Sequence, residues 1–193
     1  MRVLIADDEA LIRMGLRTML RDLGYTVVAA ATDGREAFRL ACERQPDLAI
    51  LDIKMPRMDG LTAAEAIARH CPMPVVLLTA YSERDLVERA AATENVQAYL
   101  VKPIREIELI PAIDLAVARY AEWQALQKEA ASYREALATR QVVAQAKALL
   151  MARDGLTEGD AFQEIQHRAR RQRQTMREIA DEILLLEGQD GEG

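Results

Sequence analysis

Short apolar runs alternate with amphipathic stretches over about the first 105 residues of the chain. The apolar runs predict strands near residues 3–6, 26–31, 48–51, 75–79 and 98–101. The amphipathic stretches predict helices near residues 10–23, 35–44, 61–69 and 83–92. Strands that alternate with helices in this way are typical of a parallel sheet. We therefore predict an α/β domain over this part of the chain.

Individual residues mark the faces and ends of these helices. Four apolar residues of the first helix recur at spacings that we expect to face the sheet, namely Leu11, Met14, Leu16 and Leu20. Gly24 is a normal stop after that helix, and Ser82 is a good N-cap for the helix over 83–92. The helices therefore begin and end between the predicted strands.

Beyond Lys102-Pro103 the strand signals stop and the pattern becomes helical. A narrow apolar seam with alternating spacings of three and four runs through Trp123, Leu126, Ala130, Tyr133 and Leu137. That spacing suggests a coiled coil. A helix that packs on its own chain would show the same spacing, so both structures stay open.

The last third of the chain predicts a small all-α domain of three helices. Apolar residues line one face of the first helix, namely Val142, Val143, Ala146, Leu149 and Leu150. Thr157 is placed to cap the second helix, which extends to about Arg171. The third helix is amphipathic through Met176, Ile179, Ala180, Ile183 and Leu184. We divide the chain into a first domain over 1–120, a helical linker over 121–136, the all-α domain over 137–187 and a tail over 188–193 that we expect to be disordered.

Composition narrows the classes of function. Half of the residues are hydrophobic and 4% are aromatic, so the core must be aliphatic. The formal net charge of −6 means that nucleic-acid binding would need a local basic patch. No apolar run approaches the roughly 18 residues of a membrane span, and the start lacks a signal-peptide pattern. We therefore expect a cytoplasmic protein with no membrane partner, in which Cys42 and Cys71 are buried thiols.

Acidic, hydroxyl and basic residues stand at the ends of the apolar runs. Asp7 and Asp8 follow the first run and Asp52 follows the third, while Thr79 ends the fourth and Lys102 follows the fifth. Because the carboxyl ends of parallel strands form the ligand-binding edge of an α/β sheet, we expect these side chains to lie together. The alternative is that each acid is a helix N-cap and the lysine a solvated charge.

Such a cluster fits phosphoryl transfer. Carboxylates that lie close together repel each other and need a cation, and oxygen ligands favour Mg²⁺. Asp52 can act as the nucleophile. Lys102 and Mg²⁺ can offset charge on the phosphoryl oxygens, and Thr79 can donate a hydrogen bond to one of them.

Four segments resemble the receiver domain of bacterial two-component response regulators, namely Asp7-Asp8, the LDIKMPRMDG stretch around Asp52, Thr79-Ala80 and Tyr99-Leu100-Val101-Lys102-Pro103. The resemblance implies a flavodoxin-like fold with a five-stranded parallel sheet, and phosphorylation of Asp52 by a sensor histidine kinase. It implies that Mg²⁺ is held by Asp8, Asp52 and the backbone carbonyl of Lys54, with Asp7 in support. It also implies a switch through Thr79 and Tyr99.

The stretch from Ile165 to Arg177 holds five arginines and no acid. These arginines could form a patch for an anionic partner. A solvated charged face is the usual alternative for such a run. The residues alone leave both open.

Residues 137–151, followed by Gly155-Leu156-Thr157 and Ala161-Phe162, resemble the ANTAR domain, the RNA-binding module of transcription antitermination regulators. The resemblance implies binding to RNA stem-loops in nascent transcripts, which prevents a terminator from forming. Phe162 falls in the apolar pattern, so we expect basic residues to make most of the contacts. The candidates are Arg140, Lys147, Arg168, Arg170, Arg171 and Arg173.

Together these patterns predict a response regulator in which phosphorylation of Asp52 controls RNA binding and antitermination, with a homodimer as the coupling. We expect no turnover of a separate substrate, because no second catalytic cluster is visible. Two alternatives are a DNA-binding response regulator and a regulator that acts through protein–protein contacts of its C-terminal helices.

Overall fold

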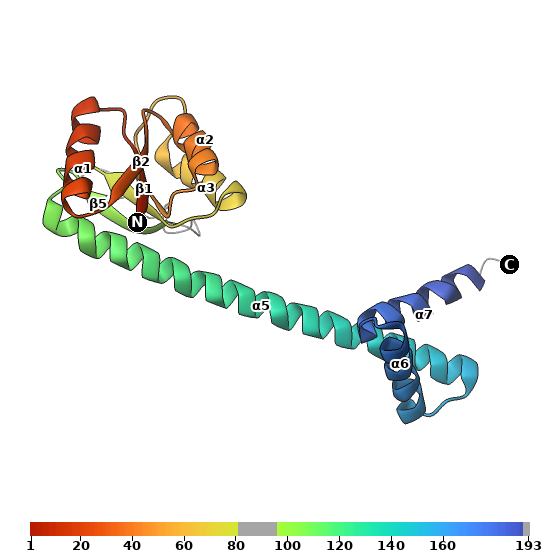
Figure 1. Cartoon of the computed structure of the whole chain (residues 1–193). Helices are drawn as coiled ribbons and strands as arrows, with labels where there is room; N and C mark the ends of the chain where they lie inside the picture. Colours follow the sequence, from red (N-terminus) through yellow and green to blue (C-terminus); the bar gives the residue numbers. More distant parts are fainter. Residues whose placement is uncertain (81–95, 191–193) are drawn as a thin grey trace. The chain divides into compact units, whose positions relative to one another are not determined.

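The computed structural model describes residues 1–80 and 96–190, which divide into two compact units (Figure 1). The first unit spans Met1–Gln124 and the second Ala125–Gly193. The helix predicted over 83–92 and its N-cap Ser82 lie outside the described residues. No helix in the described part of the chain is long and apolar enough to cross a membrane.

The first unit is built on a five-stranded parallel sheet, as the sequence predicts. Its strands are β1 (Arg2–Ala6), β2 (Thr26–Ala31), β3 (Leu48–Asp52), β4 (Val75–Thr79) and β5 (Val96–Val101). They lie in the order β2-β1-β3-β4-β5, and all neighbours pair in parallel. This is the flavodoxin-like order, whose topological switch point lies between β1 and β3.

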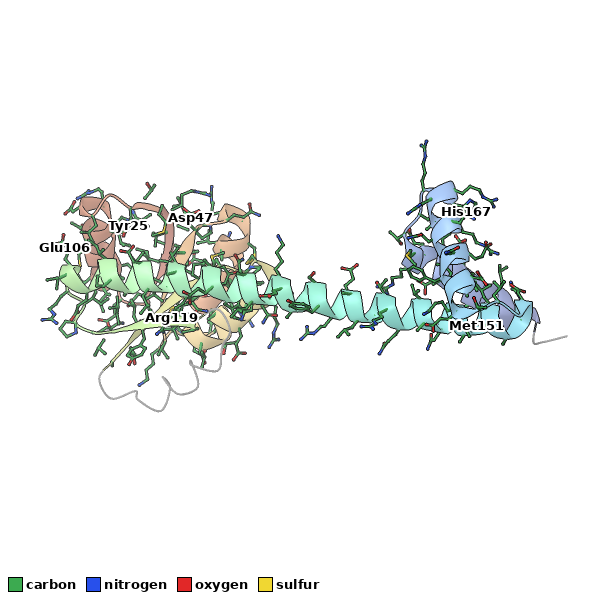
Figure 2. The ribbon with its side chains drawn as sticks, turned by 90° about the horizontal axis from the view of Figure 1, so that it is seen from below. Tyr25, Asp47, Glu106, Arg119, Met151 and His167 are labelled. Atoms are coloured by element: carbon green, nitrogen blue, oxygen red, sulfur yellow. A yellow bond between two sulfur atoms is a disulfide. The ribbon has the colours of Figure 1, made fainter. Side chains whose placement is uncertain are left out.

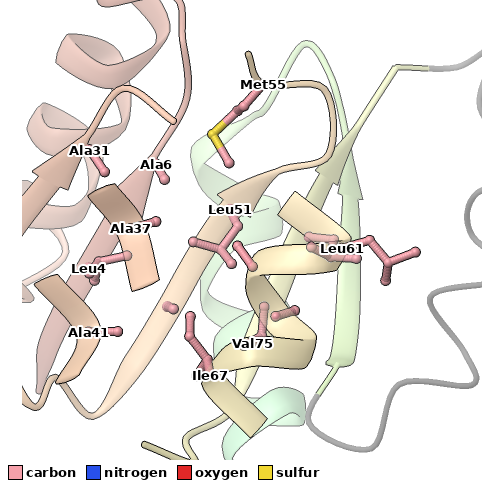
Figure 3. Packing of buried hydrophobic residues seen from close by; sticks show 14 of the residues in the cluster. Leu4, Ala6, Ala31, Ala37, Ala41, Leu51, Met55, Leu61, Ile67 and Val75 are labelled. Atoms are coloured by element: carbon pink, nitrogen blue, oxygen red, sulfur yellow. The ribbon is translucent and has the colours of Figure 1, made fainter. Parts of the chain in front are cut away.

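Helices cover both faces of this sheet. They are α1 (Ala10–Asp22), α2 (Gly34–Arg44), α3 (Gly60–His70) and the first part of α5 (Glu106–Asp154). Val3 and Ile5 of β1 pack in one core with α1 and α5, whereas Leu4 and Ala6 pack in the other with α2 and α3 (Figure 3). This alternation follows from the two-residue period of a strand. Burial on both faces explains why the central strands read as continuous apolar runs.

One part of the prediction for α1 is wrong. Leu16 and Leu20 are buried against the sheet, but Leu11 is 81% exposed and Met14 is 67% exposed. At 100° per residue, these two side chains lie well away from the Leu16 direction. Ile12 packs against the sheet instead of them.

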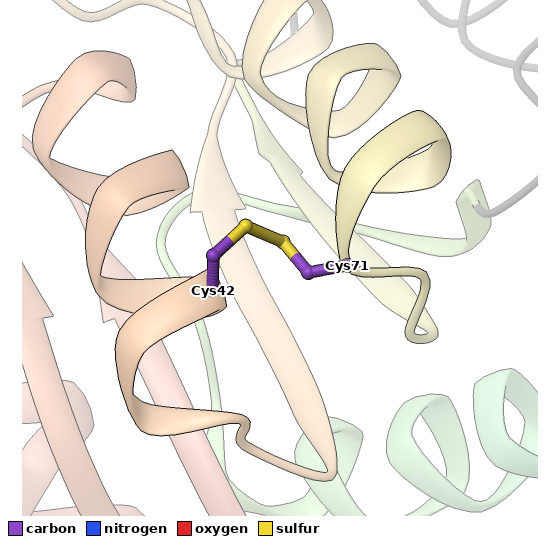
Figure 4. Close-up of a disulfide and its surroundings, with 2 residues drawn as sticks. All are labelled: Cys42 and Cys71. Carbon is purple, nitrogen blue, oxygen red and sulfur yellow. A yellow bond between two sulfur atoms is a disulfide. The ribbon is translucent and has the colours of Figure 1, made fainter.

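The prediction of two buried free thiols is also wrong. Cys42 and Cys71 form a disulfide, with their Cα atoms 5.3 Å apart, and both residues are half-buried (Figure 4). Cys42 lies in the last turn of α2 and Cys71 is the C-cap of α3. The pair forms because these two helices pack side by side on one face of the sheet and end at the same level, which sequence spacing does not reveal.

The second unit contains the rest of α5, α6 (Glu158–Gln172) and α7 (Met176–Asp190). Its core comes from all three helices and contains Val143, Ala146, Leu150, Ala161, Ile165, Ala169, Ile179, Ala180 and Ile183. Thr157 caps α6 by accepting a hydrogen bond from the Asp160 backbone N–H, as expected. The last helix extends through Asp190, which is three residues into the segment for which we expected a disordered tail.

The linker expected over 121–136 is part of α5. Leu126, Tyr133 and Leu137 of the apolar seam are each more than 60% exposed, so these side chains do not pack on their own chain. Trp123 differs, because its ring stacks on Tyr120 with the centroids 5.7 Å apart. One turn earlier, Arg119, which is labelled in Figure 2, donates a hydrogen bond to the Gln97 carbonyl of β5 over 3.3 Å.

Candidate functional site: an acidic cluster and a basic groove

Three carboxylates meet at the carboxyl edge of the sheet. Asp52 is the last residue of β3, and Asp7 and Asp8 directly follow β1, which pairs with β3. One oxygen of each lies within 4.8 Å of the other two. Asp7 and Asp52 are buried and Asp8 is exposed. The strand register therefore brings together the three acids that the sequence analysis placed at this edge.

Lys102 neutralises part of this charge. Its Nζ lies 2.8 Å from Asp7 Oδ2 and 3.0 Å from Asp52 Oδ1. Burial opposes the charged ammonium, but its hydrogen bonds to Asp7 and Asp52 raise the pKa of Lys102. The lysine reaches the acids because it directly follows β5. The alternative that Lys102 is a solvated charge is therefore wrong.

The charged form of Asp52 is disfavoured in this cluster. Burial raises its pKa to about 6, the hydrogen bond and charge of Lys102 oppose the rise, and the charges of Asp7 and Asp8 add to it. One lysine therefore does not compensate the three acids. A hard divalent cation with oxygen ligands, such as Mg²⁺, fits this donor set, and the cluster can hold one.

The two switch candidates differ in exposure. Thr79 ends β4, is 2% exposed, and donates its hydroxyl hydrogen to the Ala80 carbonyl over 3.1 Å. Tyr99 of β5 is 55% exposed. Lys54, whose carbonyl is the remaining ligand candidate, follows β3 in the loop that leads to α3.

The contacts that hold this loop were not predicted from the sequence. Arg57 adopts a left-handed backbone conformation with φ of 64°, and its guanidinium pairs with Asp33, the N-cap of α2. The Gly34 N–H donates to the Met58 carbonyl over 3.0 Å, and the Gly60 N–H donates to the Ile53 carbonyl over 2.9 Å. The Asp-Gly pairs that open α2 and α3 were visible signals, but nothing local indicates the role of Arg57.

At Gly60 the chain passes unusually close to the phosphoacceptor candidate. A Cβ atom at this position would lie 2.0 Å from the backbone carbonyl oxygen of Asp52. Only glycine permits this approach without moving one of the two segments. The start of α3 is thus packed directly on the end of β3.

The RNA-contact candidates fall into two groups in the second unit. Arg140 and Lys147 of α5 line a groove of about 900 Å³. The other four lie on α6 or at its C-cap, namely Arg168, Arg170, Arg171 and Arg173. Two candidates are in ion pairs, because Lys147 contacts Glu158 and Arg168 contacts Glu164, each over 2.6 Å.

Phe162 does not belong to the buried face of α6, contrary to our expectation. Its side chain is 41% exposed and lines the same groove. The buried positions are Ala161, Ile165 and Ala169, which follow one another at intervals of four residues. Phe162 lies about 100° around the helix from Ala161 and so faces outward.

Two family models match the chain. The response regulator receiver domain matches residues 3–114, and the ANTAR domain matches residues 131–184. The chain is 53% identical over 183 residues to the transcriptional regulatory protein PdtaR of Mycobacterium tuberculosis (strain ATCC 25618 / H37Rv), across 95% of this chain and 89% of that protein. It is 42% identical over 109 residues to the probable transcriptional regulator ycf27 of Guillardia theta, across 56% of this chain and 42% of that protein.

Solved structures of receiver domains share the fold of the first unit. The signal receiver domain of a modulated diguanylate cyclase from Desulfovibrio desulfuricans G20 is 32% identical with a TM-score of 0.58, and covers 62% of this chain and 95% of that one. The response regulator domain of Thermotoga maritima CheB is 29% identical with a TM-score of 0.57, and covers 61% of this chain and 96% of that one. The chain therefore belongs to the response regulators that join an N-terminal receiver domain to a C-terminal ANTAR domain.

Proposed function

We propose that a sensor histidine kinase phosphorylates Asp52 and that this phosphorylation controls RNA binding by the ANTAR domain, which gives transcription antitermination. The observation that carries the proposal is a single chain that holds both a cluster suited to phosphoryl transfer and an ANTAR match. The receiver match supports a histidine kinase as the donor, and the ANTAR match supports stem-loops of nascent transcripts as the target. Both proposed partners support a cytoplasmic location.

In this proposal each side chain of the cluster has a role. One oxygen of Asp52 is held by Lys102, so the second oxygen attacks the phosphorus atom. The phosphorus–nitrogen bond to the imidazole of the kinase breaks as the oxygen–phosphorus bond forms, and the electron pair leaves with the imidazole nitrogen. Lys102 then stabilises the negative charge on the transferred group.

Mg²⁺ completes this site in the proposal. Asp8, Asp52 and the backbone carbonyl of Lys54 would hold it, and Asp7 would support it while it stays paired with Lys102. When bound, the ion supplies positive charge that offsets the phosphoryl oxygens. The chain acts on itself here and turns over no separate substrate.

The phosphorylated state is passed on through Thr79 and Tyr99. The Thr79 hydroxyl exchanges the Ala80 carbonyl for a phosphoryl oxygen, and the exposed Tyr99 ring turns inward. The surface around β5 and α5 changes as a result. We propose that this favours a homodimer through the exposed seam of α5, in which Leu126, Tyr133 and Leu137 contact a second copy.

Filter binding tests the function directly. Full-length chain is incubated with Mg²⁺, with or without acetyl phosphate, and titrated against labelled transcripts that overlap terminators. We expect tighter binding after phosphorylation, no such gain for Asp52→Asn, and little competition from duplex DNA. Equal and negligible affinity in both states would contradict the proposal.

A further inference from the structure

The groove in the second unit is long and lies between three helices. It follows α5 from Ser132 to Lys147, which is four turns or roughly 22 Å, and is closed by Phe162 of α6 and by the start of α7. Val143, Phe162 and Met176 give it an apolar lining. Its volume of about 900 Å³ is at the upper end of the range for ligand sites.

Positive charge surrounds this apolar lining. Arg140, Lys147 and Arg177 line the groove, against one acid, Glu135. This local excess of cations contrasts with the net charge of −6 for the whole chain. Among the described residues, Arg140 forms no ion pair, and the Arg177–Asp181 pair is long at 3.8 Å. An apolar surface with a cationic border fits a polyanion that also presents flat apolar groups, which is the chemistry of unpaired nucleotides.

Phe162 and Lys147 lie at the same end of the groove. Lys147 Nζ contacts Glu158 Oε1 over 2.6 Å, and Glu158 precedes Phe162 by one turn on the same face of α6. A base that stacks on the exposed Phe162 ring would therefore bring its phosphate close to Lys147. The lysine can exchange the solvent-exposed carboxylate of Glu158 for that phosphate.

We propose that the groove receives a nucleobase turned out of an RNA loop, with Phe162 as the stacking surface and Arg140 and Lys147 on the flanking phosphates. This inference rests on the RNA-binding function proposed above and specifies where one base is held. The dimer seam lies on a neighbouring face of α5. At 100° per residue, the face through Ala136, Arg140 and Val143 is rotated by roughly 70° from the face through Tyr133 and Leu137.

The test begins with a pool of RNA hairpins that share one stem and carry a randomised loop. Full-length chain is phosphorylated with acetyl phosphate and used to enrich binders, and the most enriched hairpin becomes the probe. A version of that probe with 4-thiouridine at each loop position in turn is photo-crosslinked and the modified peptide is mapped. We expect one loop position to crosslink to the peptide that contains Phe162.

Substitutions then distinguish the contribution of base stacking to RNA affinity from the contribution of charge. We expect Phe162→Ala to weaken binding by between about 10-fold and 100-fold. Phe162→Leu, which keeps the apolar bulk but not the flat ring, should lose about 10-fold, and Phe162→Tyr should restore wild-type affinity. None of the Phe162 variants should change how RNA affinity depends on salt. Arg140→Gln, in contrast, should lower the slope of log affinity against log salt by about one. Gln163→Ala, at the exposed neighbouring position, is the matched control, and circular dichroism checks that each variant folds.

Three results would overturn the groove site. Unchanged affinity of Phe162→Ala, with crosslinks only to the α6 arginines, would leave RNA binding standing and place the base elsewhere. A change of oligomeric mass in Phe162→Ala without a change in hairpin affinity would make the groove a protein contact. Failure to enrich any hairpin in either phosphorylation state would remove the proposed function together with the site.

Discussion

The guanidinium of Arg57 donates a 2.9 Å hydrogen bond from Nε to the buried carboxylate of Asp33, and so ties the loop between β3 and α3 to the start of α2. Hydrogen bonding to Arg57 is the largest cause that lowers the pKa of Asp33, followed by the hydrogen bond from the Glu36 N–H. An acid whose folded pKa is lowered adds stability above its unfolded pKa of about 3.8, and that stability is lost as pH falls through the lower folded value.

We therefore expect Arg57→Ala to lower the urea midpoint of the receiver unit at about pH 7. The gap to wild type should close as the pH is lowered below about 3.8, because Asp33 then becomes protonated in both chains. Arg69→Ala is the control, since among the described residues the ion pair of Arg69 is a long one of 3.9 Å to the half-exposed Glu65. A gap that is the same at both pH values would contradict the assigned role of the pair.

The charge state of Asp52 makes stability depend on pH in the opposite direction. Its folded pKa of about 6 lies above the ordinary value of 3.8, so the folded chain holds the extra proton between these values, and stability falls as pH rises through that window. In a chelator at about pH 7.5, we expect Asp52→Asn to raise the free energy of unfolding by about 1–3 kcal/mol, at about 1.4 kcal/mol per pKa unit.

That gain has two further signatures in urea unfolding. It should shrink as pH falls from about 7 to about 4, where wild-type Asp52 is itself neutral. It should also shrink when Mg²⁺ replaces the chelator, because a cation removes the repulsion. A variant no more stable than wild type in chelator at about pH 7.5 would show that the charge of Asp52 is already compensated.

Gly60 and Gly15 give opposite expectations for the same substitution. Gly60→Ala places a methyl group against the Asp52 carbonyl, so we expect a loss of about 1–3 kcal/mol in the free energy of unfolding and slower labelling by acyl phosphate. Gly15 lies inside α1 with nothing within 4 Å of an added Cβ, so Gly15→Ala should gain about 0.5–1 kcal/mol. Equal urea midpoints for the two variants would contradict the close approach at Gly60.

Because of the disulfide, we predict that the free energy of unfolding depends on whether the protein is oxidised or reduced. It closes a loop of 29 residues, so reduction should lower the free energy of unfolding by about 3.5 kcal/mol. Thiol titration in denaturant should find no free thiol before reduction and two afterwards. The double variant Cys42→Ser, Cys71→Ser should show no response to reductant. Two titratable thiols in the untreated protein would contradict the bond.

The sheet and its acidic edge were predictable because burial and strand register act on runs of residues. Residues 48–51 of β3 are all apolar because both faces of the strand are covered, and the acid that follows must then stand at the edge. Parallel pairing of β1 with β3 brings Asp7 next to Asp52 without further information. The positions of Thr79 and Lys102 follow from the same rule for β4 and β5.

Contacts that depend on where two separate elements end were not predictable. Asp33 and Arg57 are 24 residues apart and meet only because α2 and α3 begin side by side. Cys42 and Cys71 meet at the other ends of these two helices. Phe162 was misassigned because apolar character does not fix helix phase, and small alanines at 161 and 169 occupy the buried face instead.

Trp123 is the single tryptophan of the chain, and its ring is stacked on Tyr120 near the end of the first unit. Indole fluorescence from the unmodified protein thus originates at one position, on the helix that also packs against β5 and begins the exposed seam. The molecule carries its own optical probe at the segment through which the receiver would signal. The dimer proposed through the exposed seam could be followed there by emission and anisotropy, without an attached dye.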